Sequence, residues 1–152
     1  ICYTSTKKTI EKSTLYFAVV NGNLKLIQLL LTQPEININS GIKEILISRF
    51  RNKSDIIQNK SPLYLAVEKE NLEIVKILIE HSKINVDFVS TLSKYCHGNE
   101  EKIRKTAYQL ASEKQNNEIC QLLLSKNCSK DFVSNADDSI IKEEEDSEYD
   151  GF

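Results

Sequence analysis

The apolar positions of this chain recur in three similar blocks. Each block opens with a hydroxyl residue and reaches a small residue, Ala, five residues later. The opening segments are residues 13–19 (STLYFAV), 61–67 (SPLYLAV) and 106–112 (TAYQLAS). An Asn and then an apolar-rich segment follow each of them, at residues 24–31, 72–79 and 117–124. Self-similarity of this kind indicates a repeat architecture.

Each block predicts two short helices. Hydroxyl side chains can cap the start of the first helix, and they stand at Ser13, Ser61 and Thr106. The second segments carry apolar residues at i, i+3 and i+7, the spacing of an amphipathic helix. Helices of about two turns are unstable alone in water, so packing between blocks must hold them. The expected core comprises Leu15, Ala18, Leu24, Ile27, Leu30, Leu63, Ala66, Leu72, Val75, Leu78, Tyr108, Ala111, Ile119 and Leu123.

The motif Ser/Thr-Pro-Leu-x-x-Ala, followed by a helix break, a Leu-rich helix and an Asn-containing turn, resembles the ankyrin repeat. The resemblance covers residues 13–40, 61–88 and 106–130. It implies an all-α solenoid of about three stacked helix–turn–helix repeats that binds a protein and has no catalytic activity. A tetratricopeptide array also repeats a helix pair, but it needs two longer helices of near-equal length.

Two departures from the ankyrin pattern concern single positions. The family usually has His where this chain has Tyr16, Tyr64 and Gln109, so the usual Thr–His bond is absent. The Gly between the two helices is kept at Gly22 but replaced by Glu70 and Gln115. We expect the next residues, Asn71 and Asn116, to take the left-handed conformation there.

The third departure is the spacing of the repeats, 48 and 45 residues here against about 33 in the family. The additional residues fall in the connectors 41–60 and 89–105, where we expect long finger loops. In the first connector, Ile42, Ile45, Leu46, Arg49 and Phe50 follow the i, i+3, i+4, i+7, i+8 pattern. That pattern predicts a short amphipathic helix, either folded back on the stack or offered to a partner.

Length and composition indicate one globular domain of 152 residues, 40% apolar and 28% charged. We divide it into a truncated lead-in (1–12), a repeat domain (13–130) and a tail (131–152). The chain begins at Ile1 and contains no Met, so we expect a fragment or processed piece with upstream sequence missing. No segment approaches the roughly 18 consecutive apolar residues that a membrane span needs.

Charge is concentrated at the end of the chain. Residues 137–150 hold one of the 20 basic residues and eight of the 22 acidic residues, leaving a net charge of +5 elsewhere. The eight acids are Asp137, Asp138, Glu143, Glu144, Glu145, Asp146, Glu148 and Asp150. Blocks of like charge usually stay solvated, so we expect a disordered acidic tail.

The cysteines and histidines give little sign of a metal site or a disulfide framework. Cys2, Cys96, Cys120 and Cys128 are irregularly spaced, which favours reduced thiols and a cytoplasmic or nuclear protein over disulfides. A zinc site of Cys96 and His97 with a later cysteine is the alternative, but it lacks C-x2-C spacing. No G-x-S-x-G, H-E-x-x-H or phosphate-loop motif occurs. We therefore expect no metal, no cofactor and no enzyme activity.

The family resemblance also implies a binding face. The two residues that end each first helix are expected to face the inner, partner-binding side, and they are Val20, Asn21, Glu68, Lys69, Glu113 and Lys114. The predicted function is a protein–protein interaction module, a scaffold or adaptor, that uses this face and the finger loops. We expect an unidentified protein partner and no small-molecule substrate.

Two alternative functions stay open. The chain could be the regulatory or targeting part of a larger enzyme. The basic residues of the connectors could also form a weak nucleic-acid surface. Interleaved acids and the scarcity of aromatic residues argue against the second alternative.

Overall fold

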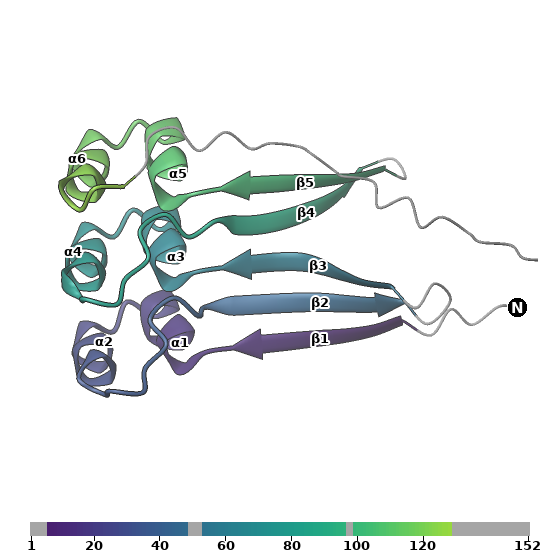
Figure 1. Ribbon diagram of the computed structural model, residues 1–152, viewed down its shortest axis with the longest axis horizontal. Coiled ribbons are helices and arrows are strands. Elements are labelled where there is room, and N and C mark those ends of the chain that lie inside the picture. The colour runs from purple at the N-terminus through teal and green to yellow at the C-terminus, as the bar shows by residue number, and fades with distance from the viewer. Residues whose placement is uncertain (1–5, 49–52, 97–98, 129–152) are drawn as a thin grey trace, which may run out of the picture.

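The computed structural model describes residues 6–48, 53–96 and 99–128. Three helix pairs stack side by side, and a five-stranded sheet extends away from them (Figure 1). The pairs are α1 (Thr14–Val20) with α2 (Leu24–Leu31), α3 (Pro62–Glu68) with α4 (Leu72–Glu80), and α5 (Ala107–Glu113) with α6 (Asn117–Ser125). None of the described helices is long and apolar enough to cross a membrane.

The sheet contradicts the all-α fold expected from the sequence. Its strands are β1 (Thr6–Lys12), β2 (Ile42–Ser48), β3 (Lys53–Lys60), β4 (Ser90–Cys96) and β5 (Asn99–Lys105). They pair in chain order, and every pairing is antiparallel. The two connectors therefore form β2–β3 and β4–β5 hairpins, where the sequence analysis expected loops. Strand β1 lies in the segment treated as a lead-in.

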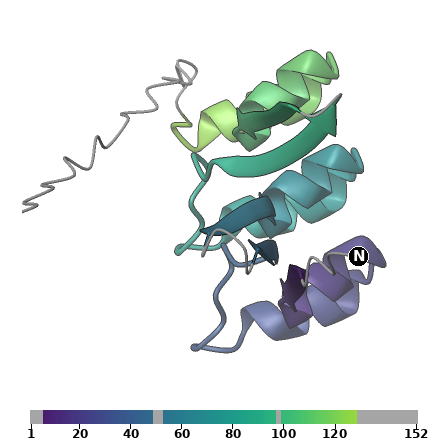
Figure 2. The same ribbon diagram turned by 90° about the vertical axis from the view of Figure 1, so that its right-hand side faces the viewer.

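The register shows where the hairpins touch. β1 pairs with β2 along its whole length, from Thr6↔Ser48 to Lys12↔Ile42. β3 and β4 pair only at Gln58↔Leu92 and Asn59↔Thr91, close to the helices. Seen end-on, the helix pairs rise as steps of one stack beside the sheet (Figure 2). The hairpins therefore extend sideways from the stack of helices.

The prediction of an amphipathic helix in the first connector is wrong. Ile42, Ile45 and Leu46 lie in β2, and the register shifts between Glu44 and Ile45. A short apolar run does not distinguish helix from strand by its period alone. The β-branched Ile residues here favour the strand. Arg49 and Phe50, the rest of that pattern, lie outside the described residues.

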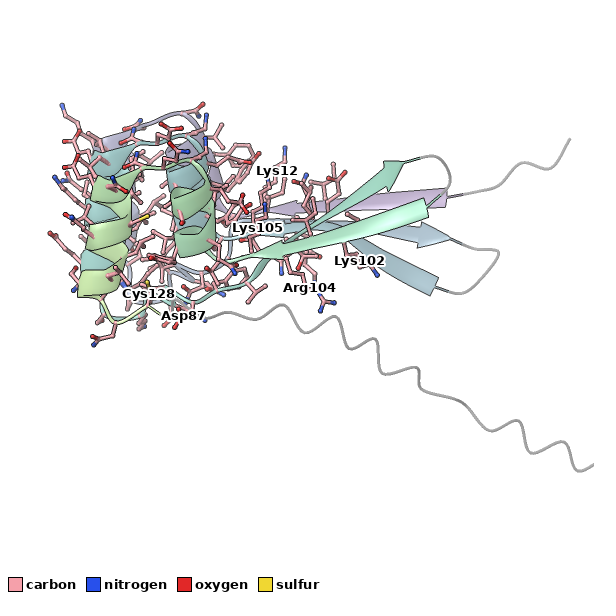
Figure 3. The ribbon with its side chains drawn as sticks, turned by 90° about the horizontal axis from the view of Figure 1, so that it is seen from above. Lys12, Asp87, Lys102, Arg104, Lys105 and Cys128 are labelled. Carbon is pink, nitrogen blue, oxygen red and sulfur yellow. The ribbon has the colours of Figure 1, made fainter. Side chains whose placement is uncertain are left out.

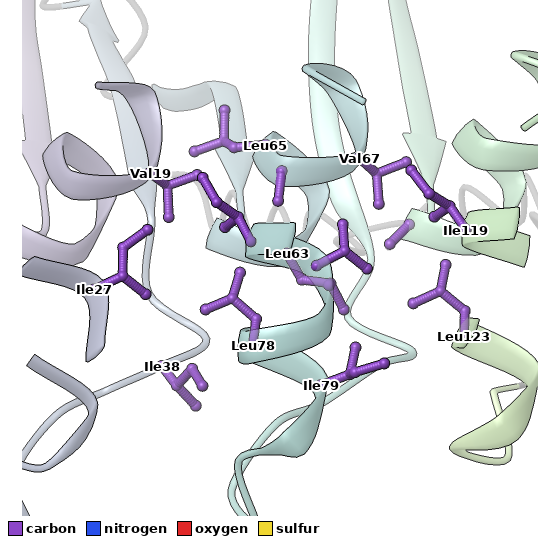
Figure 4. Close-up of a cluster of buried hydrophobic side chains, with 14 of the residues drawn as sticks. Val19, Ile27, Ile38, Leu63, Leu65, Val67, Leu78, Ile79, Ile119 and Leu123 are labelled. Atoms are coloured by element: carbon purple, nitrogen blue, oxygen red, sulfur yellow. The ribbon is translucent and has the colours of Figure 1, made fainter. Parts of the chain in front are cut away.

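The core lies between neighbouring helix pairs (Figure 4). Ten residues of the predicted core are buried, namely Leu15, Ala18, Ile27, Leu63, Ala66, Val75, Leu78, Ala111, Ile119 and Leu123. The other four are half-buried against it: Leu24, Leu30, Leu72 and Tyr108. The prediction missed Val19, Ile38, Val67, Ile74 and Ile79, which are also buried. The apolar stripe of the middle pair is wider than i, i+3, i+7, because α3 packs on both α1 and α5.

The predicted caps of the first helices are confirmed. The backbone N–H groups of Tyr16, Tyr64 and Gln109 donate to the side-chain oxygens of Ser13, Ser61 and Thr106, at 3.0, 3.1 and 3.3 Å. The Asn residues have the same role for the second helices. Leu26, Ile74 and Ile119 donate to Asn23, Asn71 and Asn116, at 3.0, 3.1 and 3.1 Å. Every helix of the stack thus begins at a side-chain cap.

The left-handed positions differ from the expectation. Gly22, Glu70 and Gln115 have φ values of 65°, 55° and 57°. Asn71 and Asn116 have φ values of −86° and −85° and act as caps instead. Two repeats therefore keep the backbone that suits Gly while carrying a side chain there, at some cost in backbone strain.

Gly41 sits where the chain leaves the first repeat. Its carbonyl accepts a hydrogen bond from the N–H of Ser13 at 2.9 Å. A Cβ at this position would collide with the backbone carbonyl oxygen of Lys60. The start of β2 therefore passes against the end of β3 at a distance that only glycine allows.

Leu78, which is 0% exposed, tests the core. We expect Leu78→Ala to lower the free energy of unfolding by about 2–5 kcal/mol, because truncation leaves a cavity. Leu29, 61% exposed on α2, is the matched control, and Leu29→Ala should change stability by less than about 0.5 kcal/mol. Urea denaturation followed by circular dichroism measures both. Equal losses would remove Leu78 from the core.

Gln115, at φ 57°, tests the backbone strain. We expect Gln115→Gly to raise the free energy of unfolding by about 0.5–1 kcal/mol, because Gly enters the left-handed region without a Cβ clash. Gln121→Gly, at an exposed position inside α6, should instead cost about 1 kcal/mol. Thermal and urea unfolding give both values, and a destabilised Gln115→Gly protein would contradict the strain argument.

Candidate partner-binding surface

Each repeat places a strand and a first helix at a corner that opens on one side of the sheet (Figure 3). The strand ends in Lys, the next residue caps the helix, and the helix follows. Side chains four residues apart on a helix share one face. Three rows of side chains result, which we call the palm: Lys12, Tyr16 and Val20; Lys60, Tyr64 and Glu68; Lys105, Gln109 and Glu113.

The second row is closed by an ion pair. The Lys60 Nζ atom donates to both carboxylate oxygens of Glu68, at 2.9 and 3.1 Å, and lies 5.8 Å from the centre of the Tyr64 ring. The Lys60 side chain is 14% exposed, whereas that of Glu68 is 42% exposed. An ion pair this open to solvent stabilises the fold by less than about 1 kcal/mol. Its main effect is to hold Glu68 in place.

The third row repeats this arrangement. The Lys105 Nζ atom lies 2.6 Å from the Glu113 carboxylate, and Thr106 and Gln109 form a reciprocal capping box at the start of α5. A further ion pair crosses between repeats, because Lys114 donates to Glu70 at 2.9 Å. Glu68, Glu70 and Glu113 therefore each have a lysine partner.

The first row differs from the other two. Val20 stands where the others have Glu, and the Lys12 Nζ atom instead lies 5.4 and 5.7 Å from the ring centres of Tyr16 and Phe17. The two rings meet edge to face at 5.4 Å. Phe17 is 49% exposed, while the equivalent Leu65 is 6% exposed, because α1 packs on α3 but no described helix packs on the outer side of α1. The first repeat therefore offers a cation beside an exposed aromatic ring.

The residues expected to bind a partner lie at the C-terminal ends of the first helices. Val20, Glu68 and Glu113 end the helices, and Asn21, Lys69 and Lys114 are their C-caps. All are exposed except the half-buried Val20. Nothing in the structure tests whether they bind, so that assignment stays a prediction.

Sequence reasoning missed the lysine column of the palm: Lys12, Lys60 and Lys105. These residues stand immediately before the three hydroxyl caps, so the repeat already contained the signal. The signal is weak, because lysine is common throughout this chain. The strand ending there brings each lysine back over the helix, with Arg104 on the opposite face of the sheet from Lys105 (Figure 3).

Burial and two carboxylates act on Tyr64. Burial raises the pKa of its hydroxyl above the ordinary value of 10.0, and the negative charges of Glu68 and Glu113 raise it further. Glu113 belongs to the next repeat, so the second and third rows act on each other electrostatically. Tyr64 is therefore neutral throughout the physiological range and serves as a packed, uncharged centre of the palm.

The structure does not describe the side chains of Cys96 and His97, the zinc candidates, whereas it does describe His81 and Cys120. His81 is the C-cap of α4, and its Nδ1 accepts the N–H of Lys83 at 3.2 Å. Cys120 is half-buried in α6, where burial raises the pKa of its thiol. Cys96 ends β4, while His97 lies outside the described residues. Among the described residues, no group of three or more potential ligands could hold a metal ion.

A small pocket lies at the base of the sheet. Its volume is about 210 Å³, and Glu11, Lys43 and Asn59 are among the residues that line it. Sites for small molecules are usually larger, at about 300–1,000 Å³. Its lining mixes opposite charges, and we assign it no ligand.

The three described helix pairs share the same caps and the same left-handed turn between their helices. A family model of ankyrin repeats, in three copies, matches residues 15–135. The chain belongs to the ankyrin repeat family. A comparison with curated proteins found no match. Ankyrin repeats generally serve as protein–protein interaction modules, so the general function expected from the resemblance is confirmed.

Tyr64 allows a test of the electrostatics of this ankyrin surface. Its folded-state pKa is raised, so its contribution to stability is fully present below pH 10.0 and is lost as pH rises through the raised value. We expect wild-type unfolding free energy to fall more between pH 9 and 11 than that of Tyr64→Phe. Tyr108→Phe, at a tyrosine whose position is half-buried in α5, is the control. Equal losses in wild type and Tyr64→Phe would contradict the raised pKa.

Proposed function

We propose that this chain is an adaptor or scaffold that binds a protein partner through the palm. The observation that carries this proposal is the contrast between two sets of equivalent positions. Ala18, Ala66 and Ala111 are identical and buried, as packing between repeats requires. At the equivalent palm positions, Glu68 and Glu113 are exposed, and the first repeat has the half-buried Val20 in their place. Packing does not determine the second set, which leaves it available for recognition.

The hairpins support the proposal by enlarging the surface. A stable interface usually takes about 20–30 residues from each partner, more than the nine residues of the palm. Strands β2 to β5 add a wall beside the first helices, at an angle to them (Figure 3). A partner seated in the corner contacts both walls, and this suits a folded domain or a peptide with a bend.

The charges of the connectors argue for a protein partner over nucleic acid. Lys60 and Lys105, two of the basic residues in the connectors, are paired with Glu68 and Glu113. Phosphate binding would have to replace these carboxylates. A protein surface can instead accommodate both members of each pair. Rim charges of this kind act mainly on the association rate and its salt dependence.

The test is affinity capture with the full chain and quantitative mass spectrometry. We expect Glu68→Ala with Glu113→Ala to lose most of the partner, because both carboxylates lie on the palm. The matched control changes two exposed polar residues on outer helices, Gln28→Ala with Gln121→Ala, and should retain it. Equal recovery of the same proteins by the palm variant and wild type would place the binding face elsewhere.

A further inference from the structure

One kind of ion pair recurs along the palm, and a second kind crosses once between the second and third repeats. Within a repeat, the lysine before the cap pairs with the acid eight residues later, as in Lys60–Glu68 and Lys105–Glu113. Between repeats, the lysine at the C-cap pairs with the acid at the left-handed position of the preceding repeat, as in Lys114–Glu70. The repeat therefore defines where each lysine should find a carboxylate.

The first repeat lacks both of these carboxylates. Val20 takes the place of Glu68, so Lys12 has no acid eight residues later. Gly22 takes the place of Glu70, so Lys69 in the second repeat has no acid to reach in the first. Neither lysine has a carboxylate partner in the part of the chain that the structure describes. The neighbouring Glu11 belongs to the opposite face of β1, because successive strand residues alternate.

An apolar contact is available at the same end. Phe17 is 49% exposed and lies under the Lys12 ammonium group. A segment that brought a carboxylate to Lys12 can also place an apolar or aromatic group of its own against this ring. Exposed ion pairs alone bind weakly because solvent screens them. Contact with the Phe17 ring adds binding energy that does not depend on charge.

The chain contains a segment with these properties. Residues 137–152 carry the eight acids listed above together with Tyr149 and Phe152. Neighbouring helices pack about 8–10 Å apart, so the first repeat is roughly 20 Å from the third. Twenty residues of extended chain span about 65 Å, so the length between Cys128 and Tyr149 is sufficient. Tethering raises the local concentration to the millimolar range, where even a weak contact is populated.

We infer that Lys12 and Phe17 of the first repeat, with Lys69 of the second, form a docking site for an acidic segment at the first-repeat end of the palm, and that residues 137–152 of this chain occupy it. The carboxylates of the segment take the places of the two that the first repeat lacks. A protein partner that uses this end must displace the segment, and it does so with an acidic surface of its own. This inference rests on the proposed function only in placing the partner on the same palm.

The experiment uses a fluorescein-labelled synthetic peptide of residues 137–152 and measures its anisotropy in low salt. The receptor is the full chain in which the four aspartates and four glutamates of residues 137–150 are changed to Asn and Gln. We expect this neutral-tail chain to bind the peptide. Wild type should bind it at least tenfold more weakly, because its own segment competes. Raising the salt concentration should weaken the binding, because the contacts are exposed charges.

Charge substitutions locate the site. In the neutral-tail chain, Lys12→Ala with Lys69→Ala should weaken peptide binding at least tenfold. Lys25→Ala with Lys126→Ala removes the same charge from two exposed positions off the palm and should leave binding within twofold. Circular dichroism confirms that each variant is folded. Peptides carrying Tyr149→Ala and Phe152→Ala should bind more weakly, because the two rings are lost from the contact with Phe17.

Three outcomes overturn the inference: no peptide binding to the neutral-tail chain, equal binding by wild type and the neutral-tail chain, or equal losses in the two lysine variants. None of these measurements needs the protein partner. Failure here therefore leaves the proposed function standing, and failure of the capture experiment leaves the docking of the acidic segment standing.

Discussion

Helices of seven residues make too few internal hydrogen bonds to persist in water, so α1, α3 and α5 depend on contact with their neighbours. Ala18, Ala66 and Ala111 are buried to 1%, 0% and 0% exposure, and their small side chains let the helices approach closely. This contact fixes the spacing of the repeats. Strands β1, β3 and β5 each end at the residue before a cap, so the same spacing sets the positions of the hairpins and of the palm lysines.

The parts of the fold that the sequence predicted are those determined by local chemistry. A hydroxyl cap at Ser61 with Pro62 behind it marks a helix start through bonds within one turn. Leu63 in α3 and Leu78 in α4 are both buried, and each belongs to an apolar stripe that the period of its own helix predicts. These features need no knowledge of distant residues, and the family resemblance then supplied the order in which the helix pairs stack.

The parts that escaped prediction depend on pairing between distant segments. β1 is held by β2, whose paired residues lie 30 to 42 positions later, and the polar residues in both strands give no clear alternation. Glu70 carries a left-handed φ that Asn71 would tolerate better, because the turn geometry is imposed by the two helices it joins. The Lys105–Glu113 pair requires a strand that ends beside the helix. Because the connectors were predicted to be loops, the strand β5 and its ion pair with α5 were not predicted.

In a repeat protein, departures from the repeat carry information that the repeat itself does not. Positions fixed by packing must match, because every interface between neighbours buries the same contacts. An ion pair on the exposed side is under no such constraint, so its loss in one copy costs little stability. Val20 and Gly22 remove two carboxylates from the first repeat and nothing from its core. The change is therefore confined to the charge that the end of the palm presents, which is the property that selects an acidic segment over a neutral or basic one.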